Sequence, residues 1–311
     1  MEAALVGGHT GRMRVIVSPG QGSQKPGFLS PWLDDPDTRS TLSRWSELIE
    51  LDLIAHGSES DAETIKDTRI AQPLIVAAGL IAGRAVQDRL SGLPAHYAGH
   101  SVGEFTAAAL AGVISDEEAL TLVARRGAAM AKAASAIPTG MVAVVGLDVE
   151  SLRHPLEEMG LFTANVNSSS QVVAAGELSA LDALKNDPPA GTRVIALEVA
   201  GAFHTHYMDS AREELERAAA ELSPTDPHSV LYTNHDGRIV ESGREYLDLL
   251  VSQTTSPVRW DRCMDAFMAA GAQEIVELAP SGALAGLAKR ALPGVTIRRI
   301  DLPTDLDELN N

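Results

Sequence analysis

A serine lies at the centre of a G-x-S-x-G pentapeptide, GHSVG, at residues 99–103. A short strand-like segment around Tyr97 precedes it and an apolar helical segment follows, which is the strand–turn–helix context of a nucleophile elbow. In such a turn the glycines permit a sharp bend, and the helix N-terminus offers free N–H groups to a developing oxyanion. The pattern predicts a nucleophile at Ser101, and a glycine-rich turn with an incidental serine is the alternative.

An activated serine requires a base, and the nine histidines of the chain offer several candidates. We favour His204, in GAFHTH at residues 201–206, because it follows the last strand of a predicted insertion, where loops tend to line a cleft. His206 stands two residues further on, and spacing alone does not separate the two. Many acids lie between the serine and these histidines, but none has a distinctive motif, so a backbone or amide oxygen is an alternative partner for the imidazole.

The loop PGQGSQ at residues 19–24 is a candidate for the second oxyanion donor. It ends the first strand-like segment, at residues 14–18, and its glycines leave backbone N–H groups free to face a ligand. A plain turn without a binding role would have the same composition.

An arginine is directed inward from a predicted helix, which we expect to begin at Ser115 as the N-cap, with Glu118 three residues on in a capping box. Within residues 118–130, the buried stripe at helical spacing consists of Leu120, Val123, Gly127 and Met130. Arg126 lies on this stripe, whereas Arg125 is turned away by about 100°. A buried guanidinium is costly unless an anion meets it, so the pattern predicts either an internal salt bridge to one of the 42 acids or an anionic substrate.

Composition excludes several classes of protein. The formal net charge of −17 argues against general nucleic-acid binding, which needs a basic footprint. No apolar run approaches the ~18 residues of a membrane helix, and residues 1–13 read as a flexible extension rather than a signal peptide, so we expect a cytoplasmic protein without membrane contact. A basic cluster at Lys289, Arg290, Arg298 and Arg299 is either a solvated surface or a docking patch for an acidic partner.

The single cysteine, Cys263, rules out an internal disulfide. It lies in a helical stretch without a surrounding motif, so we interpret it as a core thiol. The histidines show no HExxH arrangement, and no metal site is expected.

Alternating strand-like and helical segments predict an α/β fold with a mostly parallel sheet. The strand-like runs lie at residues 14–18, around 97, and at 229–233, 274–278 and 296–301. Residues 139–203 follow a different order, βαββαβ, which is the ferredoxin-like pattern. We therefore expect a large hydrolase-like unit, residues 14–138 with 204–311, and an inserted ferredoxin-like unit, residues 139–203.

Five motifs occur in the order of one family: PGQGSQ, GHSVGE, an arginine 25 residues after the serine, GAFH and QTTSPVRW. Together they resemble the malonyl-CoA:acyl carrier protein transacylases, in particular the actinobacterial enzymes, and the related acyltransferase domains of polyketide synthases. The similarity runs from about Arg14 to the C-terminus.

The resemblance implies a role for each matching residue. Ser101 would be the nucleophile and His204 the base. The backbone N–H groups of Gln21 and Val102 would form the oxyanion hole. The main-chain carbonyl of Gln253 would orient the histidine, so that no acid is needed.

The resemblance also implies how the acyl group is recognised. Arg126 would pair with the free carboxylate of the malonyl group. Phe203 directly precedes the histidine, and in related domains a phenylalanine at this position is associated with selection of malonyl over methylmalonyl. Gly201 replaces the histidine that usually begins this motif. Asn165 and Asn167 would line the cleft from the insertion.

The implied reaction is a ping-pong transfer of malonyl from malonyl-CoA, through a serine ester, to the phosphopantetheine thiol of acyl carrier protein, which supplies fatty acid synthesis. It needs no metal or bound cofactor, and we expect a monomer. A serine esterase or thioesterase on a related α/β fold is the alternative, and a non-catalytic binding module is a second one.

Overall fold

The computed structural model describes residues 12–91 and 93–310, so residues 1–11 of the predicted extension lie outside the described residues. Four strands form a parallel sheet in the order β2-β1-β8-β9. Their bounds are β1 Arg14–Ser18, β2 His96–Gly99, β8 Glu274–Leu278 and β9 Thr296–Ile300. All five residues of β1 and of β8 are buried, as expected for the interior strands of a parallel sheet covered on both faces.

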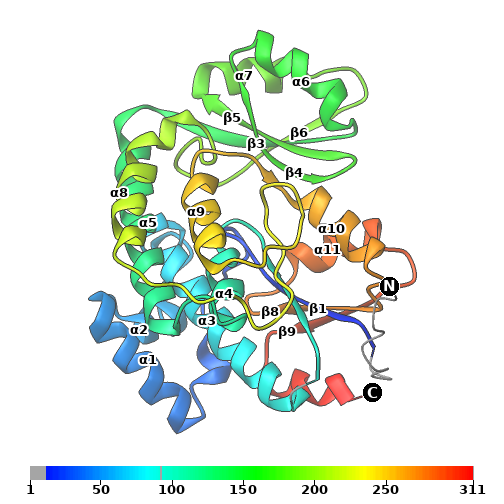
Figure 1. The fold of residues 1–311 in the computed structure, drawn as a ribbon. Coiled ribbons are helices and arrows are strands. Elements are labelled where there is room, and N and C mark those ends of the chain that lie inside the picture. The colour runs from blue at the N-terminus through cyan, green and yellow to red at the C-terminus, as the bar shows by residue number, and fades with distance from the viewer. Residues whose placement is uncertain (1–11, 92, 311) are drawn as a thin grey trace.

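Helices surround this sheet, and Figure 1 shows most of them in the lower part of the molecule. Those before the insertion are α1 Pro36–Ile49, α2 Leu53–Ser58, α3 Thr68–Leu90, α4 Gly103–Leu110 and α5 Asp116–Ala136. Those after it are α8 Asp209–Ala220, α9 Gly243–Gln253, α10 Trp260–Ala269 and α11 Ala283–Ala291. Short 3-10 helices span Ser30–Trp32, Thr64–Lys66, His206–Met208 and Pro303–Asn310.

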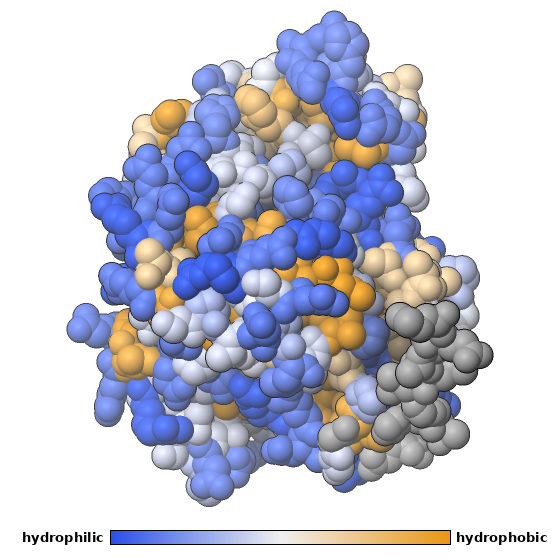
Figure 2. All heavy atoms as spheres, viewed as in Figure 1, coloured by the Kyte–Doolittle hydropathy of each residue, from blue (hydrophilic) through white to orange (hydrophobic). Residues whose placement is uncertain are grey.

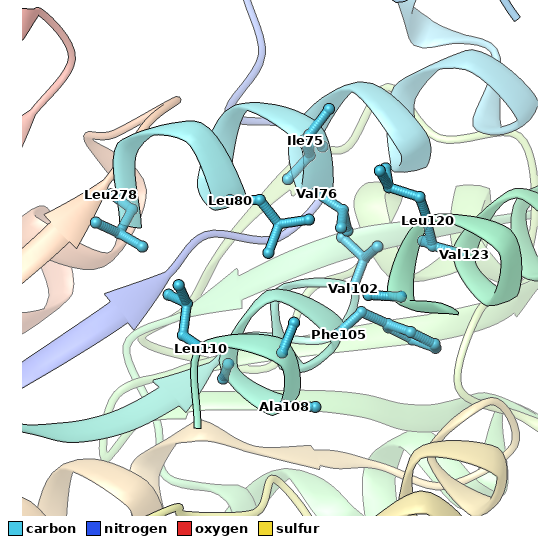
Figure 3. Packing of buried hydrophobic residues seen from close by; sticks show 14 of the residues in the cluster. Ile75, Val76, Leu80, Val102, Phe105, Ala108, Leu110, Leu120, Val123 and Leu278 are labelled. Carbon is cyan, nitrogen blue, oxygen red and sulfur yellow. The ribbon is translucent and has the colours of Figure 1, made fainter. Parts of the chain in front are cut away.

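The short helix α4, which follows the predicted elbow, lies at the centre of the core. Every one of its residues is buried. Figure 3 shows Val76 and Leu80 of α3 on the side that faces α4, near Val102 and Leu110. Such complete burial fixes the position of the turn before α4.

The arginine-bearing helix α5 begins as the sequence predicts. The hydroxyl of Ser115 accepts a hydrogen bond from the N–H of Glu118, and the Glu118 carboxylate accepts one from the N–H of Ser115, which completes a capping box. All four residues of the predicted stripe are buried, and Arg126 is completely buried with them. Arg125 is exposed, so the helical phase assigned from the sequence is confirmed.

The second sheet has the order β6-β3-β5-β4-β7. Its strands are β3 Thr139–Val145, β4 Phe162–Ser168, β5 Gln171–Glu177, β6 Arg193–Ala196 and β7 Val258–Arg259. Neighbouring strands are antiparallel except β4 and β7. The helices α6 Val149–Glu158 and α7 Leu178–Asn186 cover the outer face of this sheet, at the top of Figure 1.

Successive residues of β3 point to opposite faces of the small sheet, so their side chains belong to two different hydrophobic cores. Val142 and Val144 pack with α6 and α7. Met141 and Ala143 pack on the other face, with Met130 of α5 and with the segment after β6. The inner face of the small sheet therefore lies against the helix that carries Arg126.

Two predictions about elements need correction. The run at 229–233 is no strand: Leu231 makes an isolated bridge with Tyr97 of β2.

Helix α3 is long and apolar enough to cross a membrane by length and composition, which the sequence analysis missed. However, 72% of its apolar 18-residue segment is buried inside the fold. A buried core helix passes the same test, and Figure 2 shows mainly hydrophilic residues on the face viewed there.

Gly103 allows α4 to approach β1, because a Cβ at this position would clash with the carbonyl oxygen of Ser18. We expect Gly103→Ala to lower the free energy of unfolding by about 1–3 kcal/mol, as overpacked cores do. The matched control is Gly286→Ala in α11, where a Cβ meets nothing within 4 Å. That change should be neutral or stabilising, by up to about 1 kcal/mol of helix propensity. Urea denaturation measures both, and equal stability of the two variants would contradict the expected close approach.

Candidate active site

The predicted nucleophile and base are brought together. The Oγ of Ser101 lies 2.8 Å from Nε2 of His204, although 103 residues separate the two in the chain. Ser101 follows β2 in the turn before α4, and His204 lies between β6 and the 3-10 helix His206–Met208. His206 is exposed and stacks on Tyr207, so the geometry selects His204 where spacing left both open.

Both members of this pair have left-handed backbone, with φ of 52° at Ser101 and 61° at His204. Such values are uncommon for residues with a side chain and cluster at functional sites. At the elbow, a Cβ on Gly99 would collide with the backbone of Gly103. The turn is therefore as tight as a nucleophile elbow requires.

The main-chain carbonyl of Gln253, the last residue of α9, accepts a hydrogen bond from Nδ1 of His204 at 2.7 Å. A carbonyl oxygen only accepts, so Nδ1 carries the proton in the neutral imidazole and Nε2 is left as an acceptor toward the serine hydroxyl. An imidazole in this tautomer can take the proton of Ser101 without a carboxylate behind it.

Arg126 is 0% exposed and its guanidinium reaches the same centre. One terminal nitrogen donates to Oε1 of Gln253 at 2.9 Å and lies 3.4 Å from Oγ of Ser101. The other donates to Oε1 of Gln72 in α3 at 2.8 Å, and Nε has no hydrogen-bond partner among the described residues. Within residues 12–91 and 93–310 no carboxylate lies within ion-pair distance, so a buried cation meets only neutral oxygens.

Burial shifts the pKa values of the charged groups at this centre. It lowers the pKa of Arg126 to about 10, although the nearby charge of Glu104 acts to raise this pKa. Burial, reinforced by the positive charge of Arg126, lowers the pKa of His204 to about 3, while the Gln253 carbonyl acts in the opposite direction. His204 is therefore neutral at ordinary pH, with Nε2 unprotonated.

One of the two predicted oxyanion donors adjoins the serine in the chain, and the other belongs to a residue that lines the same cavity. Val102 directly follows Ser101 at the start of α4, and Gln21 lines the same cavity from the loop after β1. The side chain of Gln21 is held by Thr68, to which Nε2 donates at 3.2 Å. In the described part of the chain neither backbone N–H donates to the protein, which leaves both free for a ligand oxygen.

A cavity of about 360 Å³ opens in front of Ser101 and His204. Phe203, 5% exposed, forms part of its wall, as do Asn165 and Asn167 of β4. Asn167 Oδ1 lies 2.9 Å from Nε2 of His100, and the buried Oδ1 of Asn165 has no hydrogen-bond partner in the part of the chain that the structure describes. The predicted residues of the insertion thus face the reacting pair across one cavity.

Several residues at this centre were missed by the sequence analysis. Gln72 is a polar residue on an otherwise apolar helix face, and that break in pattern was the available signal. Glu104 belongs to the quoted motif GHSVGE, but its burial was not foreseen. Asn234 follows the run at 229–233, and nothing local marks it as a partner of Ser101.

The basic cluster near the C-terminus separates into two parts. Arg298 pairs with Glu274 and Glu308, and Arg299 pairs with Asp301. Lys289 and Arg290 are exposed at the end of α11, and Arg290 lines the cavity. Cys263 is buried in the core, as predicted.

Comparisons with known proteins agree with this geometry. Residues 15–296 match the family described as acyl transferase domain. The malonyl CoA-acyl carrier protein transacylase of Mycobacterium tuberculosis is 48% identical over 301 residues, which are 96% of this chain and 100% of that protein. The chain belongs to the acyl transferase family.

Solved structures give the same result. The crystal structure of MCAT from Mycobacterium tuberculosis superposes with a TM-score of 0.93 at 48% identity, over 96% of this chain and 100% of that one. A malonyl-transacylase in complex with its holo type II PKS acyl-carrier protein superposes with a TM-score of 0.88 at 30% identity, over 96% and 100%.

The positive charge of Arg126 should have a measurable effect on the pKa of His204. We expect Arg126→Gln to raise the pKa of His204 from about 3 toward its ordinary value, because a nearby cation disfavours the imidazolium. Saturating malonate should do the same in the wild type, by pairing with the guanidinium. NMR titration of the histidine ring nitrogens measures both shifts.

The control is Arg125→Gln, which removes the same charge from the exposed face of α5. An equal pKa for His204 in Arg126→Gln and Arg125→Gln would rule out the electrostatic effect.

The low pKa of His204 also makes stability depend on pH. Since His204 in the unfolded chain is protonated below about pH 6.5, this group lowers the free energy of unfolding as pH falls from about 6.5 toward 3.

Proposed function

We propose that this protein transfers the malonyl group from malonyl-CoA to the phosphopantetheine thiol of acyl carrier protein, through a malonyl ester on Ser101. One observation carries the proposal: Arg126 is buried beside the Ser101–His204 pair and no carboxylate of the described residues neutralises it. A substrate carboxylate fits this position, since guanidinium–carboxylate pairs are directional and strong. The related transacylases support the same assignment.

In the first half-reaction, Nε2 of His204 takes the proton of Ser101, whose oxygen attacks the thioester carbonyl of malonyl-CoA. The backbone N–H groups of Gln21 and Val102 stabilise the resulting oxyanion. The C–S bond then breaks, and the CoA sulfur leaves with the proton held by His204. The malonyl group remains on the serine as an ester.

In the second half-reaction, the thiol of the carrier's phosphopantetheine gives its proton to His204 and attacks the ester carbonyl. The tetrahedral intermediate collapses, and the serine oxygen takes the proton back. Burial lowers the pKa of His204 and the charge of Arg126 lowers it further; pairing of the malonyl carboxylate with Arg126 offsets the second effect, so bound substrate makes the imidazole a stronger base. No metal or cofactor is required in either step.

Phe203 and Asn167 are proposed as walls of the acyl pocket. The ring of Phe203 would exclude an α-methyl group, a steric effect of about 1–3 kcal/mol. Lys289 and Arg290 are proposed to face the carrier protein, because both are exposed at the end of α11 and Arg290 lines the cavity, while Arg298 and Arg299 are paired within the protein.

We also propose a hydrolase-like large unit, residues 14–138 with 204–311, and a ferredoxin-like insertion, residues 139–203. The order β6-β3-β5-β4 and the succession βαββαβ support the second assignment. Cytoplasmic location, a monomeric state and use of the product in fatty acid synthesis stay predictions.

Intact-protein mass spectrometry tests the function. Mixing with malonyl-CoA should add one malonyl group to the peptide that contains Ser101, and holo-acyl carrier protein should then remove it and become malonylated. Ser101→Ala should show no gain, whereas the control Ser135→Ala, at an exposed site on α5, should behave as the wild type. A labelled Ser101→Ala protein would refute the assigned nucleophile. Loss of the label to water alone would favour the alternative, a serine esterase or thioesterase.

Arg126→Ala tests recognition of the carboxylate. We expect acylation by malonyl-CoA to slow by about 100-fold, corresponding to about 3 kcal/mol, while acylation by acetyl-CoA slows much less. The control Arg125→Ala removes a neighbouring charge that points to solvent. Quenched-flow measurement of acyl-enzyme formation gives both rates, and an unchanged malonyl-to-acetyl ratio would eliminate the proposed role.

A further inference from the structure

A second buried charge lies directly behind the nucleophile. Glu104, in the first turn of α4, is 1% exposed, and in the described part of the chain no basic side chain lies within ion-pair distance of it. Burial raises its pKa to about 7, against the hydrogen bonds that it accepts. Such a carboxylate is costly to bury, so the contacts that it makes must compensate.

One carboxylate oxygen of Glu104 supports the turn that carries the serine. Oε1 accepts a hydrogen bond from the backbone N–H of Asn234 at 2.7 Å. The fully buried side chain of Asn234 accepts from the N–H of Ser101 at 2.8 Å and donates to the carbonyl of Gly99 at 2.6 Å. These two backbone groups flank the left-handed turn, so Asn234 holds the elbow and Glu104 holds Asn234.

The other carboxylate oxygen supports the histidine and the arginine. Oε2 accepts from Nε2 of Gln253, which also donates to the carbonyl of Ser101 at 3.1 Å. In its ionised form this carboxylate only accepts, so it fixes which end of the Gln253 amide is the donor. The amide oxygen is thereby directed at Arg126, and the main chain of the same residue holds His204.

We propose that Glu104 is a positioning residue that holds the serine, the histidine and the arginine of this site in one arrangement, through Asn234 and Gln253. The inference rests on the proposed function, since it assigns a role at the same site. It extends that function by joining acyl recognition and base orientation at a single carboxylate that touches neither substrate nor reacting atom.

A glutamine at position 104 has nearly the same shape but a different hydrogen-bond pattern. Its amide has one oxygen and one NH₂ group, so it cannot accept from both the N–H of Asn234 and Nε2 of Gln253. If its NH₂ group faces Gln253, the Gln253 amide turns over and Arg126 loses an acceptor. If its NH₂ group faces Asn234, the elbow loses its support. Glu104→Gln therefore tests hydrogen-bond polarity with little change in packing.

The test compares two reactions of Glu104→Gln with those of the wild type. The first is inactivation by an alkyl fluorophosphonate, a serine reagent with neither a carboxylate nor CoA, and the second is acylation by malonyl-CoA. We expect the first rate to fall by about 10- to 100-fold, as for a displaced catalytic group, and the second to fall further because Arg126 is also disturbed. The control Tyr246→Phe removes only a phenol hydroxyl 3.3 Å from Oε1 and should change both rates by less than about twofold.

A double variant distinguishes positioning from a general loss of structure. In Glu104→Gln with Gln253→Glu, the donor and acceptor of this pair are exchanged and the new carboxylate faces Arg126, while the carbonyl of Ser101 loses the donor that Gln253 supplied. We expect this protein to react with the fluorophosphonate faster than either single variant. If Glu104→Gln does not fold, the comparison between Gln253→Glu alone and the double variant makes the same test.

Equal fluorophosphonate rates for Glu104→Gln and the wild type would overturn the proposal, as would a double variant slower than both single variants. A wild-type protein that reacts with the fluorophosphonate but never accepts malonyl would overturn the proposed function instead. The comparison among the Glu104 variants would still decide the positioning role.

Discussion

A buried guanidinium that no carboxylate of the described residues contacts directly is the constraint on which the rest of this site depends. The fold removes Arg126 from water and gives it two amide oxygens, those of Gln72 and Gln253. Neutral acceptors satisfy hydrogen bonds but do not neutralise the charge, so the site retains an unmet demand for an anion. A terminal nitrogen of Arg126 lies 3.4 Å from Oγ of Ser101. An acyl group whose free carboxylate paired with this guanidinium would be held close to the serine for attack.

Local patterns in the sequence predicted much of this structure. The capping box at Ser115, the stripe that places Arg126 inward and the first strand all depend on residues a few positions apart, and all are present. The run at 229–233 failed as a strand because strand formation also requires a continuous partner, and β2 offers it only an isolated bridge. The strand propensity of a segment does not produce a strand when no neighbouring strand pairs with it along its length.

The supporting residues of the site were harder to predict because their contacts span long distances in sequence. Ser101 and Asn234 are 133 residues apart, and Glu104 and Gln253 are 149 apart. No periodicity encodes such pairs. The resemblance to a family supplied Gln253 and Arg126, whose roles are tied to motifs, but Asn234 and Gln72 act through side-chain amides that only the folded arrangement brings to the centre.

The two-residue strand β7 ties the two halves of the molecule together. Val258 pairs with Asn165 of β4, and it stands five positions after Gln253, the residue that orients the imidazole. Relative rotation of the two sheets would have to break this pairing or pull on the segment that ends α9. Opening of the cleft by a hinge would therefore disturb the base, so the architecture favours a cleft that stays rigid.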